Sequence, residues 1–75
     1  MFINITIELM GSVQDIRIDD NQIIEEGIKI LQQRGKLPSG EIPDYFRSSM
    51  SQTLVSKYHT FKEAKISEGD LLKGM

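Results

Sequence analysis

The chain has 75 residues, 39% of them hydrophobic and 27% charged, with a formal net charge of −2. This length fits one domain over residues 1–75, and a domain of this size buries only about 60 to 65% of the surface that its unfolded chain exposes. The slight acidity disfavours nucleic acid as a partner, because a protein that holds phosphate backbones needs a basic surface. The chain has no cysteine and a single histidine, His59. We therefore expect no disulfide, no thiolate site and no His-rich metal site. No other feature of the sequence indicates a metal or a cofactor, and we predict neither.

No apolar run approaches the roughly 18 to 20 residues that a helix needs to cross a bilayer. The first residues, MFINITIEL, alternate apolar and polar side chains, whereas a signal peptide combines a basic start with a continuous apolar stretch. We therefore expect a protein without direct membrane insertion and without an export signal.

Alternating hydrophobicity predicts a first strand over residues 2 to 9. Every second position there carries an aliphatic side chain: Ile3, Ile5, Ile7 and Leu9. This period is typical of a strand with one buried face. Gly11 suits a tight reversal and the alternation resumes at Ile16 and Ile18, which predicts a hairpin. Val13 falls out of phase, which indicates a bulge.

A helical period follows, and it predicts a helix over residues 22 to 34. Asp20 or Asn21 can cap its start, and Gly35 suits the left-handed position just past its last turn. Gly27 inside the helix costs about 1 kcal/mol relative to Ala; a close approach to the sheet would explain it. The predicted apolar stripe consists of Ile23, Ile24, Ile28, Ile30 and Leu31.

Shorter elements complete the chain. YFRSS and TLVSKY predict two short strands, and LLK predicts a last one, with both Leu71 and Leu72 in the core. TFKEAKI predicts one helical or 3₁₀ turn that directs Phe61, Ala64 and Ile66 inward. The hairpin and the helix must bury their apolar faces against each other, and a right-handed crossover places the last strand parallel to the first. The predicted fold is α+β, a β-grasp with a mixed sheet of four to five strands packed on one helix.

Several stretches resemble known proteins of this fold. IIEEGIKILQQRGKLP is similar to the helix of ubiquitin, including the Gly and Pro that end it, and TFKEAKISEGDLL resembles the stretch that leads ubiquitin into its last strand. More narrowly, MFINITIEL, GSVQDIRI and KISEGDLLK resemble the YukD/EsaB family, small ubiquitin-fold proteins that accompany type VII secretion systems of Gram-positive bacteria. The likeness covers nearly the whole chain.

This resemblance implies an accessory protein that is not an enzyme. Such a protein is cytoplasmic, can be recruited to the inner face of the membrane, and assists or tunes export by docking to membrane components of the secretion machine, including its FtsK-like ATPase. The alternatives are a ubiquitin-like or sulfur-carrier protein of another pathway and an unrelated β-grasp interaction module. Carrier chemistry needs a flexible Gly-Gly tail, and this sequence ends in KGM, so we expect neither conjugation nor sulfur transfer.

Candidate partner-binding residues lie on the predicted strand YFRSS and just after it. Alternation directs one of Tyr45 and Phe46 outward, with Arg47 and Met50 nearby. Exposed aromatic and arginine side chains dominate the energetics of interfaces. We therefore predict partner binding through Tyr45, Phe46, Arg47 and Met50, with whichever ring is exposed making the contact. If both rings are buried, this face is only solvated.

Two charged clusters have simpler interpretations. Carboxylates at the predicted helix start are typical of capping and of dipole partners, and they lack the ligand spacing of a calcium loop. A basic segment could face nucleic acid, an acidic protein or solvent alone. The acidic cluster consists of Asp19, Asp20, Glu25 and Glu26. The basic cluster consists of Lys57, His59, Lys62 and Lys65. Finally, a short edge strand such as TLV can pair between chains, so the oligomeric state is left open between a monomer and a weak dimer.

Overall fold

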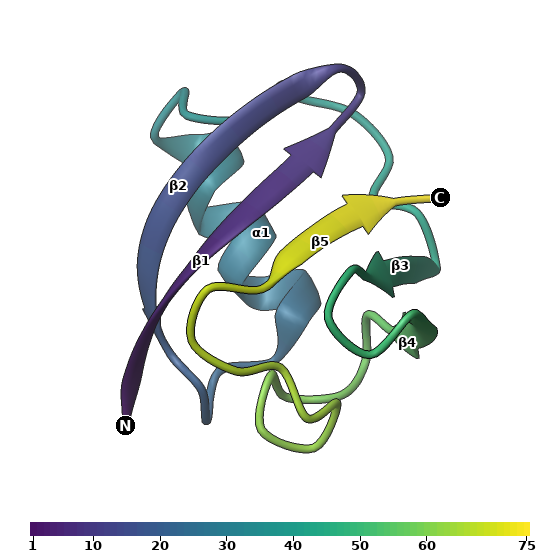
Figure 1. The fold of residues 1–75 in the computed structure, drawn as a ribbon. Helices are drawn as coiled ribbons and strands as arrows, with labels where there is room; N and C mark the ends of the chain where they lie inside the picture. Colours follow the sequence, from purple (N-terminus) through teal and green to yellow (C-terminus); the bar gives the residue numbers. More distant parts are fainter.

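The computed structural model describes residues 1–75 and contains one helix and one five-stranded sheet. The elements are β1 (Phe2–Leu9), β2 (Ser12–Asp19), α1 (Ile24–Gln33), β3 (Tyr45–Ser48), β4 (Thr53–Ser56) and β5 (Leu71–Gly74). The strand order is β2-β1-β5-β3-β4, with α1 crossing one face of the sheet (Figure 1). Strand β5 runs parallel to β1, and every other neighbouring pair is antiparallel. The predicted β-grasp, with its last strand beside the first, is confirmed.

The N-terminal hairpin is continuous. Met10 and Gly11 both have positive φ, 50° and 80°, as a two-residue turn that matches the twist of the strands requires. The register runs without interruption from Phe2 opposite Asp19 to Leu9 opposite Ser12. The predicted bulge at Val13 is therefore wrong. This side chain lies opposite Glu8 and is 60% exposed, so alternation simply places a valine on the solvent side of the sheet.

The start of α1 differs from the prediction. Ile23 occupies the N-cap position and no side chain caps the helix, so the predicted capping by Asp20 or Asn21 is wrong. The backbone N–H of Ile24 donates to the carbonyl of His59 at 2.9 Å, and the N–H of Glu25 donates to that of Lys57 at 2.9 Å. A later segment of the chain thus satisfies the first helical donors that a side chain would otherwise cap.

The end of α1 and its internal glycine behave as predicted. Gly35 has φ of 72° just after the last turn, which is the conformation that glycine adopts without strain. A Cβ atom on Gly27 would lie 2.7 Å from Cδ1 of Ile18 and 3.4 Å from the ring of Phe61. The close approach of helix and sheet is confirmed.

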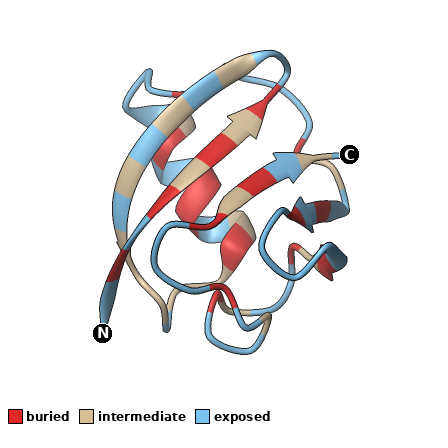
Figure 2. Cartoon of the chain, in the orientation of Figure 1, coloured by how far each residue is buried: buried red, intermediate tan, exposed pale blue.

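The core fills the space between the sheet and α1 (Figure 2). Phe61 and Leu72 are completely buried, and Ile66 is nearly so, whereas Ala64 is half-buried. Leu71 is half-exposed because strand alternation turns it to the opposite side from Leu72; its predicted place in the core is wrong. The buried apolar side chains are Ile3, Ile5, Ile7, Leu9, Ile24, Ile28, Leu31, Leu37, Ile42, Phe46, Val55, Phe61, Ile66 and Leu72.

The stretch SEGD before β5 holds this strand in place. Gly69 has φ of 84°, so the chain turns sharply and delivers Asp70 to the interior, where it is 1% exposed. Its carboxyl group accepts hydrogen bonds from the Ser48 hydroxyl at 2.5 Å, the Met50 N–H at 3.1 Å and the Leu71 N–H at 2.8 Å. One buried side chain thereby ties the start of β5 to the turn that follows β3.

Candidate docking surface

Strand β3 presents its two aromatic rings to opposite sides. Tyr45 is 54% exposed and lies on the outer face, which we define as the side of the sheet opposite α1, whereas Phe46 is 0% exposed. The expected outward orientation of one ring is confirmed; Phe46 is part of the core and is not the exposed ring, so partner binding through Tyr45 stays a prediction. Tyr45 is therefore the ring available to a partner.

A row of charged and apolar side chains crosses the outer face at the level of Arg47. The register places Arg47 opposite Lys73 of β5 on one side and opposite Leu54 of β4 on the other. Lys73 lies opposite Glu8 of β1, and its Nζ is 3.8 Å from Oε2 of Glu8. Arg47 has no carboxylate within ion-pair distance. Like charges directly opposite each other destabilise a sheet, so this arrangement does not serve the fold.

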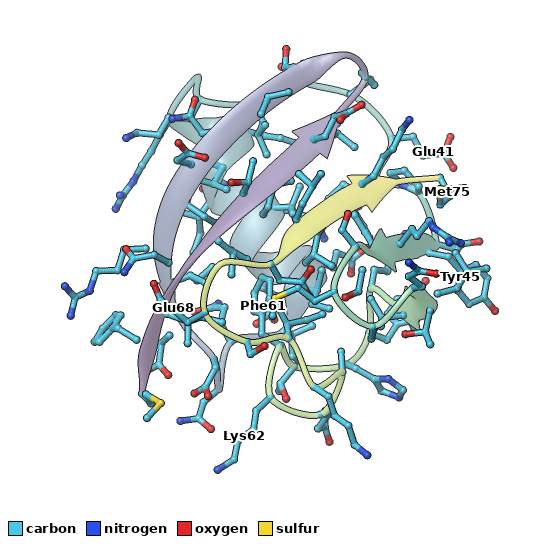
Figure 3. The ribbon with its side chains drawn as sticks, viewed as in Figure 1. Glu41, Tyr45, Phe61, Lys62, Glu68 and Met75 are labelled. Carbon is cyan, nitrogen blue, oxygen red and sulfur yellow. The ribbon has the colours of Figure 1, made fainter.

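Apolar side chains border these cations. Leu54 is 56% exposed and Tyr45 is 54% exposed. Met75 also lies beside Tyr45, since its N–H donates to the Tyr45 carbonyl at 3.1 Å, and Figure 3 shows both at the same end of the sheet. We call Tyr45, Arg47, Leu54 and Lys73 the β3 patch. It combines two cations with an exposed ring and an exposed aliphatic side chain.

Met50 lies outside the β3 patch. It is 60% exposed, but it belongs to the turn after β3, at the opposite end of this strand from Tyr45. Its backbone N–H is bound to Asp70, and its sulfur lies 3.9 Å from the Ser67 hydroxyl. The structure thus brings together two of the four predicted residues, Tyr45 and Arg47.

Sequence reasoning missed Leu54 and Lys73. Strand β4 contains the adjacent residues Leu54 and Val55, and alternation alone does not show which of them is buried. The position of Lys73 opposite Arg47 depends on the pairing of β5 with β3, which joins segments far apart in the sequence. The only sequence signal was the alternation in LLKG, which places Lys73 on the side opposite Leu72.

The predicted basic face is smaller than its sequence indicates. Lys57 is 8% exposed, and its Nζ lies 3.1 Å from Glu25, 3.3 Å from Asp44 and 3.1 Å from the Ile42 carbonyl oxygen. The Glu25 carboxylate is the main cause that raises the pKa of Lys57 above its ordinary value, with burial opposing it. Lys57 thus braces α1 against the loop before β3. The exposed members of the segment are His59, Lys62 and Lys65.

Part of the acidic cluster also forms ion pairs within the chain. Glu25 pairs with Lys57 and lies 3.9 Å from Lys29, and both Glu25 and Glu26 are in the first turn of α1. Anionic side chains there suit the positive end of the helix dipole. No group of three or more His, Cys, Asp or Glu side chains is arranged to hold a metal ion.

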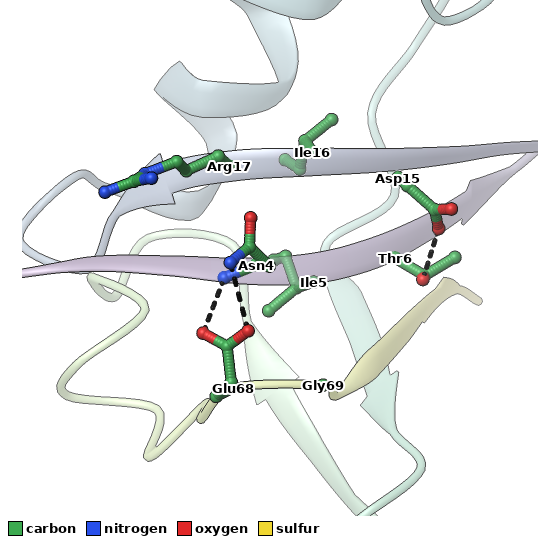
Figure 4. Close-up of a pocket in the computed structure, with 8 residues that line it drawn as sticks. All are labelled: Asn4, Ile5, Thr6, Asp15, Ile16, Arg17, Glu68 and Gly69. Carbon is green, nitrogen blue, oxygen red and sulfur yellow. Dashed lines mark hydrogen bonds between the residues drawn. The ribbon is translucent and has the colours of Figure 1, made fainter.

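A shallow groove of about 440 Å³ lies on the outer face between the hairpin and the loop before β5 (Figure 4). Its polar groups are bonded to one another. Glu68 accepts hydrogen bonds from the backbone N–H of Asn4 at 3.0 Å and from its side-chain amide at 3.1 Å, and the backbone bond in particular lowers the pKa of Glu68. The Thr6 hydroxyl donates to Asp15 at 2.6 Å. The hydrogen bonds between Asn4 and Glu68 therefore connect β1 to the loop that leads into β5.

Helix α1 is too short and too polar to cross a membrane. Neither a scan against protein families nor a search of curated proteins found a match to the sequence.

Solved structures do resemble the chain in three dimensions. A de novo design based on ubiquitin has a TM-score of 0.68 at 18% identity, covering 96% of this chain and 84% of the design. The C-terminal ubiquitin-like domain of mouse tubulin-specific chaperone e has a TM-score of 0.68 at 13% identity, covering 99% of this chain and 84% of that one. The ubiquitin of Caldiarchaeum subterraneum has a TM-score of 0.60 at 18% identity, covering 100% and 95%. The strand order, the parallel β1–β5 pair and these likenesses together give the chain the ubiquitin-like β-grasp fold.

Proposed function

We propose that this ubiquitin-like protein is a docking module of a type VII secretion system, similar to the YukD/EsaB proteins. In this proposal it works in the cytoplasm by binding, without catalysing a reaction, and is recruited to the inner face of the membrane by components of the secretion machine. The FtsK-like ATPase of that machine is the component to test first.

The observation that carries a docking role is the composition of the β3 patch. Arg47 lies opposite a second cation and has no carboxylate of its own, while Tyr45 and Leu54 expose large apolar surfaces beside it. A carboxylate supplied by a partner would remove the repulsion between Arg47 and Lys73. An apolar partner side chain would cover Tyr45 and Leu54, as in interfaces where an aromatic ring and an arginine contribute most of the binding energy.

The partner surface that fits this patch is acidic with an apolar centre. Arg47 can bind a carboxylate through two parallel N–H groups, a geometry that lysine cannot reproduce. Strand β3 is flanked by β5 and β4, so the patch rests on rigid backbone and little ordering is needed on binding. The link to secretion rests on the sequence resemblance described above, and the experiment must test this link separately.

The test is recovery of the ATPase by the tagged chain from the cells that encode it. Tagged protein should co-purify with the membrane ATPase, Arg47→Glu should lose it, and Lys62→Glu, a charge reversal outside the patch, should retain it. Deletion of the protein should alter export of small helical proteins by the secretion system. Export that is indifferent to the deletion would refute the secretion role, and a C-terminal mass increment or a ladder of conjugates would instead favour a carrier.

A further inference from the structure

Strand β2 forms one edge of the sheet and spans eight residues, Ser12–Asp19. No strand pairs with it on its outer side (Figure 1). The other edge strand, β4, spans only four residues. A long unpaired edge presents a row of N–H and C=O groups to any extended chain that can pair with it.

The hairpin geometry identifies which groups of β2 are free. The residues that flank a two-residue turn form a hydrogen-bonded pair, and such pairs alternate along an antiparallel ladder. The residues of β2 that point their backbone groups at β1 are therefore Ser12, Gln14, Ile16 and Ile18. Asp20 continues this alternation, because its N–H donates to the Met1 carbonyl at 2.9 Å. The backbone groups of Val13, Asp15 and Arg17 point away from the sheet. The Asp15 carbonyl has a single contact, from the Gln14 side chain at 3.5 Å.

We infer that the free edge of β2 pairs with β2 of a second copy of this chain, antiparallel and centred on Ile16. In a symmetric antiparallel pair, outward-pointing residues lie opposite each other only if the two-fold axis passes through a residue position and not between two residues. This requirement limits the possible registers. A centre on Asp15 places this carboxylate opposite itself, and a centre on Arg17 does the same with the guanidinium. A centre on Ile16 places Asp15 of each copy opposite Arg17 of the other.

A centre on Ile18 is the remaining register with opposite charges, because it pairs Arg17 with Asp19. However, the Asp19 carboxylate already accepts a hydrogen bond from the Asn21 N–H at 3.0 Å, and the Asp19 carbonyl accepts one from Gln22. This register would also overlap only the end of the strand. The centre on Ile16 overlaps residues 13 to 19 of the two copies and is the register that the charges of β2 favour.

The charges of β2 are available for this pairing. Asp15 and Arg17 are both exposed and neither forms an ion pair within the chain. Asp15 binds the Thr6 hydroxyl through Oδ1 alone (Figure 4), and the Arg17 guanidinium lies 5.4 Å from the centre of the Phe2 ring. An edge protected by charges of one sign would repel a second copy. In the register centred on Ile16, Asp15 and Arg17 of one copy instead attract Arg17 and Asp15 of the second copy.

The α1 side of the edge is apolar. Ile16 projects there from β2 (Figure 4), and a groove of about 430 Å³ lies between β2 and α1, lined in part by Ile16, Ile18 and Ile30. Ile30 is 39% exposed. In the proposed dimer Ile16 meets its own counterpart in a non-hydrogen-bonded pair, where side chains approach most closely. The dimer thus covers apolar surface that the monomer leaves open, and it leaves the β3 patch free.

The test is sedimentation equilibrium of the whole chain and two charge-reversal variants. Asp15→Arg places two Arg opposite two Arg, and Arg17→Asp places two Asp opposite two Asp, so each should weaken the dimer roughly tenfold or more. An equimolar mixture of the two variants restores both opposite-charge pairs and should form a heterodimer. The double variant D15R/R17D should dimerise as the original chain does, and Lys62→Glu is the control away from β2.

Circular dichroism of each variant shows whether it has folded, and the mixture and the double variant keep the inference testable if one single variant has not. A chain that is monomeric at all accessible concentrations would overturn the proposal. A dimer that both reversals leave intact would place the contact elsewhere, for example at β4, and would overturn it equally. A monomeric chain would not bear on docking through the β3 patch.

Discussion

Replacement of Asp70 by alanine should cost more stability than any conservative change at the same position. Alanine leaves the Ser48 hydroxyl and the N–H groups of Met50 and Leu71 without the oxygens that now accept their hydrogen bonds. Ser48 is fully buried. An unpaired buried group costs about 1 to 3 kcal/mol, and some of these donors sit near enough to the surface to find water. We expect a loss of about 3 kcal/mol, a large part of the roughly 5 to 15 kcal/mol that holds such a domain.

The measurement is urea unfolding followed by circular dichroism. With a slope of about 1 kcal/mol/M for a small domain, the midpoint for Asp70→Ala should fall by about 3 M. Asp70→Asn is the matched control: its oxygen can accept from the two N–H groups while its amide donates to the Ser48 hydroxyl, so we expect a loss of about 1 kcal/mol. An Asp70→Ala variant within 1 kcal/mol of the original chain would refute the reasoning that this side chain anchors β5.

Three further outcomes follow from the packing and the ion pairs. Bonds from Asn4 lower the pKa of Glu68, so its contribution to stability is present above the ordinary value of 4.5 and is lost as the pH falls through the lowered pKa; Glu68→Gln should flatten this acid limb in a pH series of unfolding curves. The pKa of Lys57 is raised above its ordinary value of 10.5, so its contribution is present below that pH and is lost as the pH rises through the raised pKa; Lys57→Met should remove the alkaline loss, and an unchanged slope would contradict the role of this ion pair. Finally, Gly74→Ala should destabilise by about 1 to 3 kcal/mol, because its Cβ would lie 2.9 Å from Leu9 and 3.2 Å from Pro43. Gly27→Ala should cost less when the two variants are compared by urea unfolding, because the nearest atom is the mobile end of the half-exposed Ile18 side chain and alanine favours a helix by about 1 kcal/mol.

The architecture could be predicted from the sequence because its strongest signals are local. The alternation of Ile3, Ile5, Ile7 and Leu9 and the helical stripe that contains Ile24, Ile28 and Leu31 each identify a buried face without knowledge of the rest of the chain. Gly35 marked the end of the helix for the same reason. Once a hairpin and one helix are placed, few arrangements bury both faces.

Features that depend on contacts distant in the sequence were not predictable in this way. The start of α1 is satisfied by the carbonyls of residues 57 and 59, so a capping signal at Asp20 or Asn21 was misleading. Lys57 belongs to a basic segment, and yet it is buried and forms ion pairs with Glu25 and Asp44 from elsewhere in the chain. The β3 patch was found in part, since Tyr45 and Arg47 share a strand, while its other members belong to strands whose partners only the fold reveals.

The way α1 begins also constrains the order in which the chain can fold. A ten-residue helix is too short to persist alone in water, and here its first donors depend on carbonyls that lie more than thirty positions later. During synthesis, the hairpin and the nascent helix must therefore wait until the segment after β4 has left the ribosome. The protein should acquire its structure in one late, concerted event, and a fragment that ends before residue 57 should stay unstructured apart from a fluctuating hairpin.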